Sequence, residues 1–358
     1  MSCLFECSTT VYWILQFCPN TIGSIQQLTE YSSTGRSRYF PTPPSVSNSS
    51  QLKENYEKRL ETITIDEWGR EPGKFSSNRK MQKITFGDRG KEPGQFDLNL
   101  GMAVSADNEI FIADVSNKRV QVSSINGTYL RLFPTDVPGE HRKISPHTVA
   151  IGVEPDKLWV AGKNKWVRGS VPTGQVVQYN MKGLPLKTFD IHVDLFTFPA
   201  IAIDVCNNKV ILGDVDTIRI YQPNGSLVEG FQVHVPKDMQ AIPIHGVASD
   251  SKGNVVLVDW RGHVQVYNHF GDMILEFVGT PDNVFPPRGI FVDSSGRIIL
   301  SNCSKNRVDM FTSQGDFVRT VVNTTNPSYI AIGPDGQLVV ANTVGTTVTI
   351  FPRHVLFP

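Results

Sequence analysis

The sequence contains an internal repeat, and this repeat restricts the chain to a small group of folds. Six segments begin with a similar short apolar run, and the central residues of these runs lie 47, 52, 46, 43 and 40 positions apart: Ala103, Ala150, Ala202, Ala248, Phe291 and Ala331. Each run is followed by a turn, a second apolar strand, a polar loop and a third apolar strand. An outer strand then ends each of the first five units, near Phe133, Phe189, Phe231, Phe277 and Val321.

Four strands per unit, at a period of roughly 40 to 50 residues, are typical of a β-propeller. A β-solenoid has a shorter period, and helical repeats place apolar residues about 3.6 positions apart. The small residues at the centres of most inner strands suit strands that crowd around a central axis. The sequence therefore predicts an all-β fold, a six-bladed β-propeller with four-stranded blades.

The two ends of the repeat region predict how the ring closes. The sixth unit has only three clear strands, while Gln82–Gly87, ahead of the first unit, resembles an outer strand without a blade of its own. Pairing these two parts would remove the open sheet edges that invite aggregation. A near copy of Gly90–Phe96 lies 21 residues earlier, at Gly69–Phe75, so the stretch around Thr62–Trp68 is a second candidate strand. We favour the strand that adjoins the first unit.

The chain before the repeat differs from it in composition. Tyr31–Ser50 is rich in Ser, Thr and Pro, as flexible linkers are. We interpret residues 1–60 as a low-complexity or disordered N-terminal segment, residues 61–81 as a linker that carries the partial repeat copy, and residues 82–358 as the propeller.

Charge and cysteine content exclude several classes of protein. Lys plus Arg and Asp plus Glu both total 34 in 358 residues, so the chain is not uniformly basic and a cationic site must be a local patch. Five cysteines, an odd number spread along the chain, argue against a disulfide framework and favour a reducing, cytoplasmic compartment. No stretch reaches the roughly 20 apolar residues that span a bilayer, so no membrane partner is predicted.

The first unit carries the most specific motif of the chain. Gly90–Phe96 (GKEPGQF) is followed by Gly101–Val104 (GMAV) and Ile112–Val122 (IADVSNKRVQV). These segments resemble an NHL repeat. The fifth unit resembles one nearly as clearly, through Arg288–Ile290 (RGI) and Asn306–Val308 (NRV).

Over residues 82–358 the chain resembles the six-bladed NHL propeller at the C-terminus of tripartite-motif ubiquitin ligases. The resemblance implies a module that recognises substrates for ubiquitin-dependent turnover, with protein or RNA as its partner. A RING domain needs about eight Cys or His ligands for its zinc ions, whereas residues 1–140 contain three cysteines and no histidine. We therefore expect no RING, no catalytic site for ubiquitin transfer and, without a coiled coil, a monomeric recognition module.

The loops between the second and third strands of the units are expected to share one face of the propeller. They and the adjoining strand ends hold the basic and aromatic residues that we predict to form a binding surface: Lys118, Arg119, Lys163, Lys165, Trp166, Arg168, Arg219, Arg261, His263, Lys305 and Arg307. Against them stand four carboxylates, Asp114, Asp214, Asp216 and Asp259, while the turns of the opposite face are acidic. Such a surface would bind an acidic protein segment or single-stranded RNA, the latter through phosphate contacts and base stacking. At Arg119 and Arg307 the alternative is that these signature residues brace the loop.

A different class of function, an enzyme, stays open as an alternative. His147 and His245 precede the centres of the second and fourth inner strands by three positions, and two histidines from alternate blades are a start for a zinc site. Some NHL and related six-bladed propellers, such as those of amidating lyases and lactonases, hold a metal in the central channel; a lyase-like site would need a third histidine, and a lactonase would need inner carboxylates. The third alternate unit offers Ser328 at the equivalent position. Apart from this lyase or lactonase alternative, no metal or other cofactor is predicted.

Overall fold

The computed structural model describes residues 83–357, with the exception of residues 141, 155, 165–172, 194–197, 238–242 and 281–286. Residues 1–82, which include the predicted N-terminal segment and the earlier strand copy around Thr62–Trp68, lie outside the described residues. The described residues include no helix with the length and apolar character that spanning a bilayer requires.

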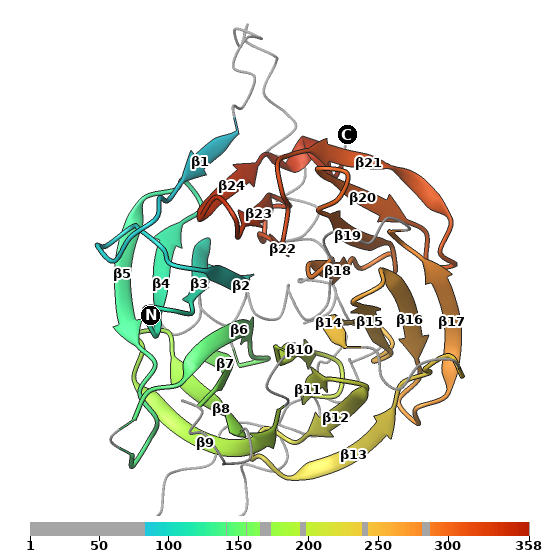
Figure 1. Ribbon diagram of the computed structural model, residues 1–358, viewed down its shortest axis with the longest axis horizontal. Coiled ribbons are helices and arrows are strands. Elements are labelled where there is room, and N and C mark those ends of the chain that lie inside the picture. Colours follow the sequence, from blue (N-terminus) through green and yellow to red (C-terminus); the bar gives the residue numbers. More distant parts are fainter. Residues whose placement is uncertain are drawn as a thin grey trace, which may run out of the picture. The chain divides into compact units, whose positions relative to one another are not determined.

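Six antiparallel sheets, each of four strands, form a ring around a central axis (Figure 1). The first blade contains β2 (Asn99–Val104), β3 (Glu109–Asp114), β4 (Arg119–Ser124) and β5 (Tyr129–Pro134). The second contains β6 (Ser145–Ile151), β7 (Lys157–Lys163), β8 (Thr173–Asn180) and β9 (Pro185–His192). The third contains β10 (Ala200–Asp204), β11 (Lys209–Asp214), β12 (Thr217–Tyr221) and β13 (Leu227–Gln232).

The remaining blades follow the same order, with the innermost strand first. The fourth contains β14 (Ile244–Ser249), β15 (Val255–Asp259), β16 (His263–Tyr267) and β17 (Met273–Val278). The fifth contains β18 (Ile290–Val292), β19 (Ile298–Asn302), β20 (Arg307–Phe311) and β21 (Phe317–Asn323). The sixth contains β22 (Tyr329–Ile332), β23 (Leu338–Asn342) and β24 (Thr347–Phe351), followed by a 3₁₀ helix over Arg353–Val355. The predicted six-bladed propeller is confirmed.

The hydrophobic core is divided among the interfaces between blades. Buried apolar side chains form six clusters, and each cluster is shared by two neighbouring blades. The second strands, such as β15, are buried along their whole length because neighbouring blades cover both of their faces. The outer strands, such as β17, alternate between exposed and partly buried side chains. The apolar runs and the alternation in the sequence thus reflect how deeply each strand lies.

The sixth blade is completed by the other end of the propeller. β1 (Ile84–Phe86) pairs antiparallel with β24, with Thr85 opposite Thr349 and their hydroxyl oxygens 3.0 Å apart. Phe86 packs against the apolar cluster that joins the sixth blade to the first. The next residue, Gly87, has φ +94°, and a Cβ there would lie 2.8 Å from the Phe96 ring. The strand that adjoins the first unit therefore closes the ring, as predicted.

Candidate functional site

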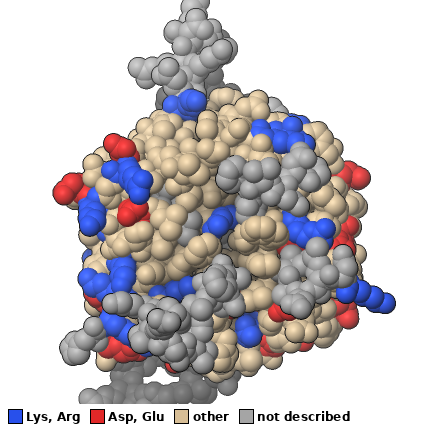
Figure 2. All heavy atoms as spheres, viewed as in Figure 1, with Lys and Arg blue, Asp and Glu red and all other residues tan. Residues whose placement is uncertain are grey.

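One side of the ring carries the loops that we predicted to form the binding surface. Because neighbouring strands run antiparallel, the connections between second and third strands open on the same side as the connections between blades. We call this side the loop face. Figure 2 shows it, with Lys and Arg side chains distributed around the ring and Asp and Glu side chains mostly near its edge.

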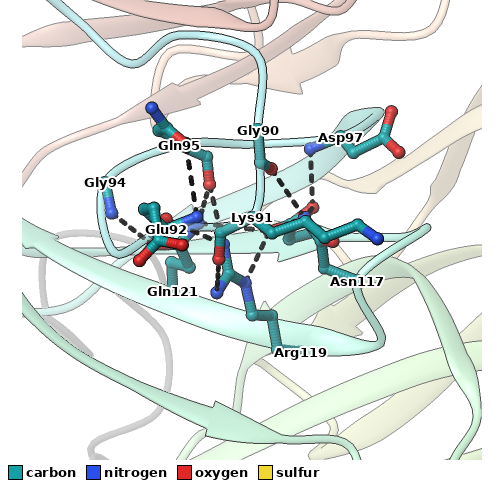
Figure 3. Close-up of polar contacts among 10 residues, drawn as sticks. Gly90, Lys91, Glu92, Gly94, Gln95, Asp97, Asn117, Arg119 and Gln121 are labelled. Carbon is teal, nitrogen blue, oxygen red and sulfur yellow. Dashed lines mark hydrogen bonds and ion pairs between the residues drawn. The ribbon is translucent and has the colours of Figure 1, made fainter.

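On the first blade, each nitrogen of the Arg119 guanidinium donates a hydrogen bond to another group of the protein (Figure 3). Its Nε donates to a carboxylate oxygen of Asp114 at 2.7 Å, and its Nη1 donates to the carbonyl of Lys91 at 2.7 Å. Its Nη2 donates to the carbonyls of Glu92 and Gln95, at 3.1 and 2.9 Å. Arg119 thus fastens the loop ahead of the first blade to β4, and its side chain is only 11% exposed.

The carboxylate of Asp114 is the centre of this network and is completely buried. Besides Arg119, its donors are the backbone N–H of Asp97 at 2.9 Å, the Asn117 amide at 3.0 Å and the Gln121 amide at 3.1 Å. A buried carboxylate needs such donors, because an unpaired buried charge is costly. The sequence motif Asp-x-x-Asn-x-Arg-x-Gln therefore describes one hydrogen-bonded structural network.

The fifth blade builds the same brace with the negative charge on a different strand. Its strand registers place Asn302 where the first blade has Asp114, and Asp309 where the first blade has Gln121. Arg307 Nε donates to Asp309 Oδ2 at 2.9 Å, and the Asn302 amide donates to the same oxygen at 3.2 Å. In both blades the signature arginine has a carboxylate partner, but only Arg119 is also bonded to a loop, since the described partners of Arg307 lie on its own blade.

The carboxylates that stand against the basic residues of the loop face are mostly hidden. Asp114, Asp214 and Asp259 are 0, 7 and 3% exposed. One oxygen of Asp259 accepts the backbone N–H groups of Arg261 and His263 at 2.8 and 2.9 Å, which is the Asx-type turn expected at this position. Burial raises the pKa of Asp259, and these two N–H groups oppose that effect. In the connections between the second and third strands, the charge that reaches solvent is therefore mainly positive.

The other predicted residues occupy different places on the blades. Lys118 and Lys305 lie in turns between second and third strands, and Lys305 is exposed. Arg219 lies inside β12, and the His263 ring approaches Glu276 with Nδ1 and Oε1 3.5 Å apart. Three further predicted residues lie outside the described residues: Lys165, Trp166 and Arg168. The binding role of the whole set stays a prediction.

At the mouth of the central channel, the ring of Phe198 gathers three side chains from other segments. The His147 ring stacks on it with ring centroids 4.8 Å apart. The guanidinium carbon of Arg288 lies 4.8 Å from the same centroid, and Lys163 Nζ lies 5.3 Å from it. Phe198 precedes β10, Arg288 precedes β18, and the other two residues come from the second blade. Three blades thus contribute to one aromatic and basic group.

His245 and Trp260 of the fourth blade extend this group. Their rings meet edge to face with centroids 6.1 Å apart, and Trp260 is 50% exposed. A small cavity of about 70 Å³ lies beside His245 and Arg288. We call these six residues the channel cluster: His147, Lys163, Phe198, His245, Trp260 and Arg288. Phe198 and Trp260 were not singled out from the sequence: Phe198 lies in a connection between blades, and Trp260 lies in the turn between β15 and β16, where Arg261 and His263 were selected instead.

Both channel histidines are held in the neutral form. Burial lowers the pKa of His147 to about 3, with further lowering by the charges of Lys163 and Arg288. Burial and the charge of Arg288 likewise lower the pKa of His245 to about 3. The Nδ1 atoms of both rings are buried and have no hydrogen-bond partner among the described residues. Backbone hydrogen bonding to Ser145 and to Pro287 opposes the lowering of the pKa of His147 and His245, respectively, without reversing it.

The geometry of the channel mouth bears on the alternative of a metal centre at His147 and His245. The part of the chain that the structure describes contains no group of three or more His, Cys, Asp or Glu side chains that could hold a metal ion. Ser328, at the third alternate position, uses its carbonyl to accept the Ser301 hydroxyl at 2.8 Å. The positive charge of Arg288 beside both histidines also opposes a cation at this place.

Comparison with known proteins gives a distant sequence relative. No protein-family model matches the chain. Over 133 residues the chain is 28% identical to Protein brain tumor of Drosophila melanogaster. The match covers 36% of this chain and 13% of that relative, so the chain spans only a small part of the relative's length. This similarity supports the resemblance to NHL repeats.

Solved structures confirm the fold at low sequence identity. A protein of unknown function from Bacteroides thetaiotaomicron superposes with a TM-score of 0.55 at 13% identity, covering 75% of this chain and 76% of that one. A streptogramin B lyase gives a TM-score of 0.52 at 13% identity, over 75 and 96% of the two chains. A catalytically inactive virginiamycin B lyase from Staphylococcus aureus, solved with quinupristin, gives 0.52 at 12% identity, over 73 and 81%. At these identities the likeness concerns the fold alone.

Proposed function

We propose that the propeller is a recognition module that binds a macromolecular ligand on the loop face, either a protein or a single-stranded RNA. The observation that carries this proposal is the imbalance of exposed charge in the connections between the second and third strands. Asp114, Asp214 and Asp259 are buried there, whereas Lys305 is exposed. A chain with zero net charge thus has a local surface suited to an anionic partner.

The resemblance to tripartite-motif NHL propellers extends this proposal to a cellular role. A module of this kind presents bound substrates for ubiquitin-dependent turnover in the cytoplasm, while other chains supply the transfer chemistry. The propeller fold and the similarity to an NHL-type relative support the recognition role. No substrate or partner is transferred from that relative, because the match covers 13% of its length.

The physics of such binding gives the proposal a measurable signature. Lysine side chains around a ring attract phosphate or carboxylate groups and release condensed counterions when a polyanion binds. For single-stranded nucleic acid, each neutralised phosphate contributes about −0.7 to the slope of log affinity against log salt. Removing two of these lysines therefore weakens the binding of an RNA and flattens its salt dependence.

The test compares two charge reversals of equal size on opposite faces of the full chain. Lys91→Glu with Lys118→Glu changes the loop face, and neither side chain has an ion pair among the described residues. Lys182→Glu with Lys252→Glu changes exposed residues in turns of the opposite face. Immobilised parent and variants are offered a cytoplasmic extract with and without RNase, and the bound material is quantified by mass spectrometry.

We expect the loop-face variant to lose most of the captured material and the opposite-face variant to retain it. Loss of the material on RNase treatment assigns RNA as the partner, and retention assigns protein. Equal capture by the parent and the loop-face variant, at equal folded content by circular dichroism, would contradict the proposal.

A further inference from the structure

Arg288 stands on the loop face but is used differently from the signature arginines. None of the described carboxylates forms an ion pair with its guanidinium, and none of the described groups accepts a hydrogen bond from it. Its guanidinium lies over the face of the Phe198 ring, 4.8 Å from the guanidinium carbon to the centroid. Stacking of this kind leaves the N–H groups at the edge of the guanidinium free to donate. Arg288 thus has unused hydrogen-bonding capacity.

Hydrogen bonds and a close contact between blades hold the backbone around Arg288 in a fixed position. The next residue, Gly289, donates its N–H to the Ser301 hydroxyl at 3.0 Å and accepts the Ser301 N–H at 2.9 Å. The Ser301 hydroxyl in turn donates to the carbonyl of Ser328 on the sixth blade at 2.8 Å. On the other side, a Cβ on Gly246 would lie 2.4 Å from the Arg288 carbonyl, so this close approach of two blades requires glycine.

The neighbours of Arg288 complete a small recognition site. Nδ1 of His147 and Nδ1 of His245 are buried without a partner, and the His147 side chain is only 4% exposed. Arg288 and His147 both contact the Phe198 ring, and Arg288 and His245 line the same cavity. One positive group thus lies close to two neutral polar rings, beside an aromatic wall formed by Phe198.

We propose that the channel cluster is a binding site for a single carboxylate group. Arg288 forms a charge-assisted, two-point ion pair with the carboxylate, and the channel histidines offer it further polar contact. The inference rests on the proposed recognition role of the loop face and names the group that is recognised there. That group is an acidic side chain, or the terminal carboxylate, of a protein ligand.

The size and wall chemistry of the cavity favour a carboxylate over a phosphate. Planar two-point pairing is a geometry in which arginine binds both groups, so it does not distinguish them by itself. The cavity of about 70 Å³ is lined partly by the apolar residues Ile201, Val247 and Ile290, which suit the methylene stem of an Asp or Glu side chain. A phosphodiester is attached to a sugar on both sides and is therefore bulkier than the carboxylate of an Asp or Glu side chain.

The test uses the full chain and small probes, so it does not depend on identifying the partner. Acetate, glutarate and inorganic phosphate are titrated at constant ionic strength, and the ring signals of isotope-labelled histidine are followed by NMR. We expect glutarate and acetate to shift the signals of His147 and His245, with saturation, and phosphate to bind at least tenfold more weakly. In Arg288→Gln the affinity for glutarate falls at least tenfold, whereas Arg353→Gln, an exposed control arginine in the 3₁₀ helix, leaves it unchanged.

A second variant protects the test against a folding defect. Arg288→Lys keeps the charge but loses the planar fork, so we expect affinity between those of the parent and Arg288→Gln, at unchanged thermal midpoint. Peptides with a free or an amidated C-terminus, with and without Glu, then distinguish a terminal carboxylate from an acidic side chain. Tighter binding of phosphate than of acetate would overturn the carboxylate assignment. Absence of any shift, while the loop-face lysine variant still loses macromolecular capture, would overturn this inference and leave the recognition role intact.

Discussion

Arg119 and Arg288 both lie on the loop face, yet the protein surrounds them in opposite ways. Every nitrogen of the Arg119 guanidinium donates to a carboxylate or carbonyl of the first blade. Arg288 has an aromatic face beside it and no described acceptor. One arginine is part of the blade, and the other is presented at the channel. A count of basic residues on a face therefore does not measure its capacity to bind an anion; the state of pairing does.

The fifth blade strengthens this lesson because it contains both kinds of arginine. Arg307 pairs with Asp309 at 2.9 Å, although the carboxylate has moved to the third strand and Asn302 takes the place of an aspartate. The arginine is thus kept with a carboxylate partner even where its neighbours change. Arg288, at the start of the same blade, has no such partner among the described residues. Whether an arginine is paired therefore depends on its position within the blade and not on which blade contains it.

The largest effect that we predict concerns the braced arginine. Arg119→Ala leaves the buried Asp114 carboxylate without its cation and the carbonyl of Lys91 without its donor, while the carbonyls of Glu92 and Gln95 keep one other donor each. Removing one member of a buried ion pair costs about 3–5 kcal/mol. We expect the free energy of unfolding, from urea titration followed by tryptophan fluorescence, to fall by about that amount. A loss below about 1 kcal/mol would mean that Arg119 does not brace the loop. The contrast between a structural Arg119 and an unpaired Arg288 would then fail.

The loop that Arg119 holds offers a second prediction, on the residue that joins it to the closing strand. Gly87 has φ +94°, and a Cβ there would lie 2.8 Å from Phe96 and 2.9 Å from the carbonyl of Thr346. Gly87→Ala therefore combines backbone strain with two close contacts, and we expect a loss of about 2–3 kcal/mol. Gly94→Ala is the matched control: its φ is +85°, but no atom lies within 4 Å of the added Cβ.

The control variant isolates the strain of the positive φ, for which we expect a loss of about 1 kcal/mol. Differential scanning calorimetry of both variants measures the difference. Equal losses would mean that the contact of Gly87 with Phe96 does not support closure of the ring. The earlier copy of this segment has Asp66 at the position of Gly87, which gives a steric reason why the strand adjoining the first unit closes the propeller.

The third prediction moves to the channel and concerns acid. The folded-state pKa of His147 and His245 is about 3, below the ordinary value of 6.5. The unfolded chain therefore takes up protons first, and stability that is complete above pH 6.5 is lost as the pH falls toward 3. At pH 5 the loss is on the order of 2 kcal/mol for each histidine. Urea titrations at several pH values measure it.

Replacing the two channel histidines provides the control for the acid effect. His147→Phe with His245→Phe should reduce the loss of stability between pH 7 and pH 5 by most of the amount that the parent shows. An unchanged pH profile would mean that the two rings are accessible to protons in the folded state. The buried, neutral histidines on which the carboxylate site depends would then be in doubt.

Much of the fold was predictable because each strand position recurs with the same burial. The inner strands carry small residues such as Ala202 and Ala248, and the second strands are continuous apolar runs. Closure by the strand at Ile84–Phe86 followed from a missing fourth strand in the sixth unit. Fold prediction succeeded where one physical constraint, crowding around an axis, acts on every unit.

The site was predictable only in part, for a physical reason that the same comparison explains. The charges of Arg119 and Arg288 look alike in a sequence, but pairing depends on carbonyls and rings that other segments bring near. The carbonyls around Arg119 belong to the loop ahead of β2, and the Phe198 ring belongs to a connection between the second and third blades. Neither contact follows from spacing within one unit. The sequence therefore identified the basic residues but could not distinguish those that are paired within the protein from those that are not.

The smallest effect on stability that we predict is that of Arg288→Gln. This variant tests whether Arg288, unlike Arg119, contributes little to the stability of the fold. Only the stacking on Phe198 is lost, and a cation–π contact at a partly exposed site is worth about 0.5–1 kcal/mol. The loss is partly offset in acid, because removing the positive charge raises the pKa of His147 and His245 toward their ordinary value. We therefore expect a slightly lower urea midpoint at pH 8 and a shallower loss of stability toward pH 5 than in the parent. A loss at pH 8 as large as that of Arg119→Ala would show that Arg288 is also a brace, and the channel would then have no unpaired cation to offer a ligand.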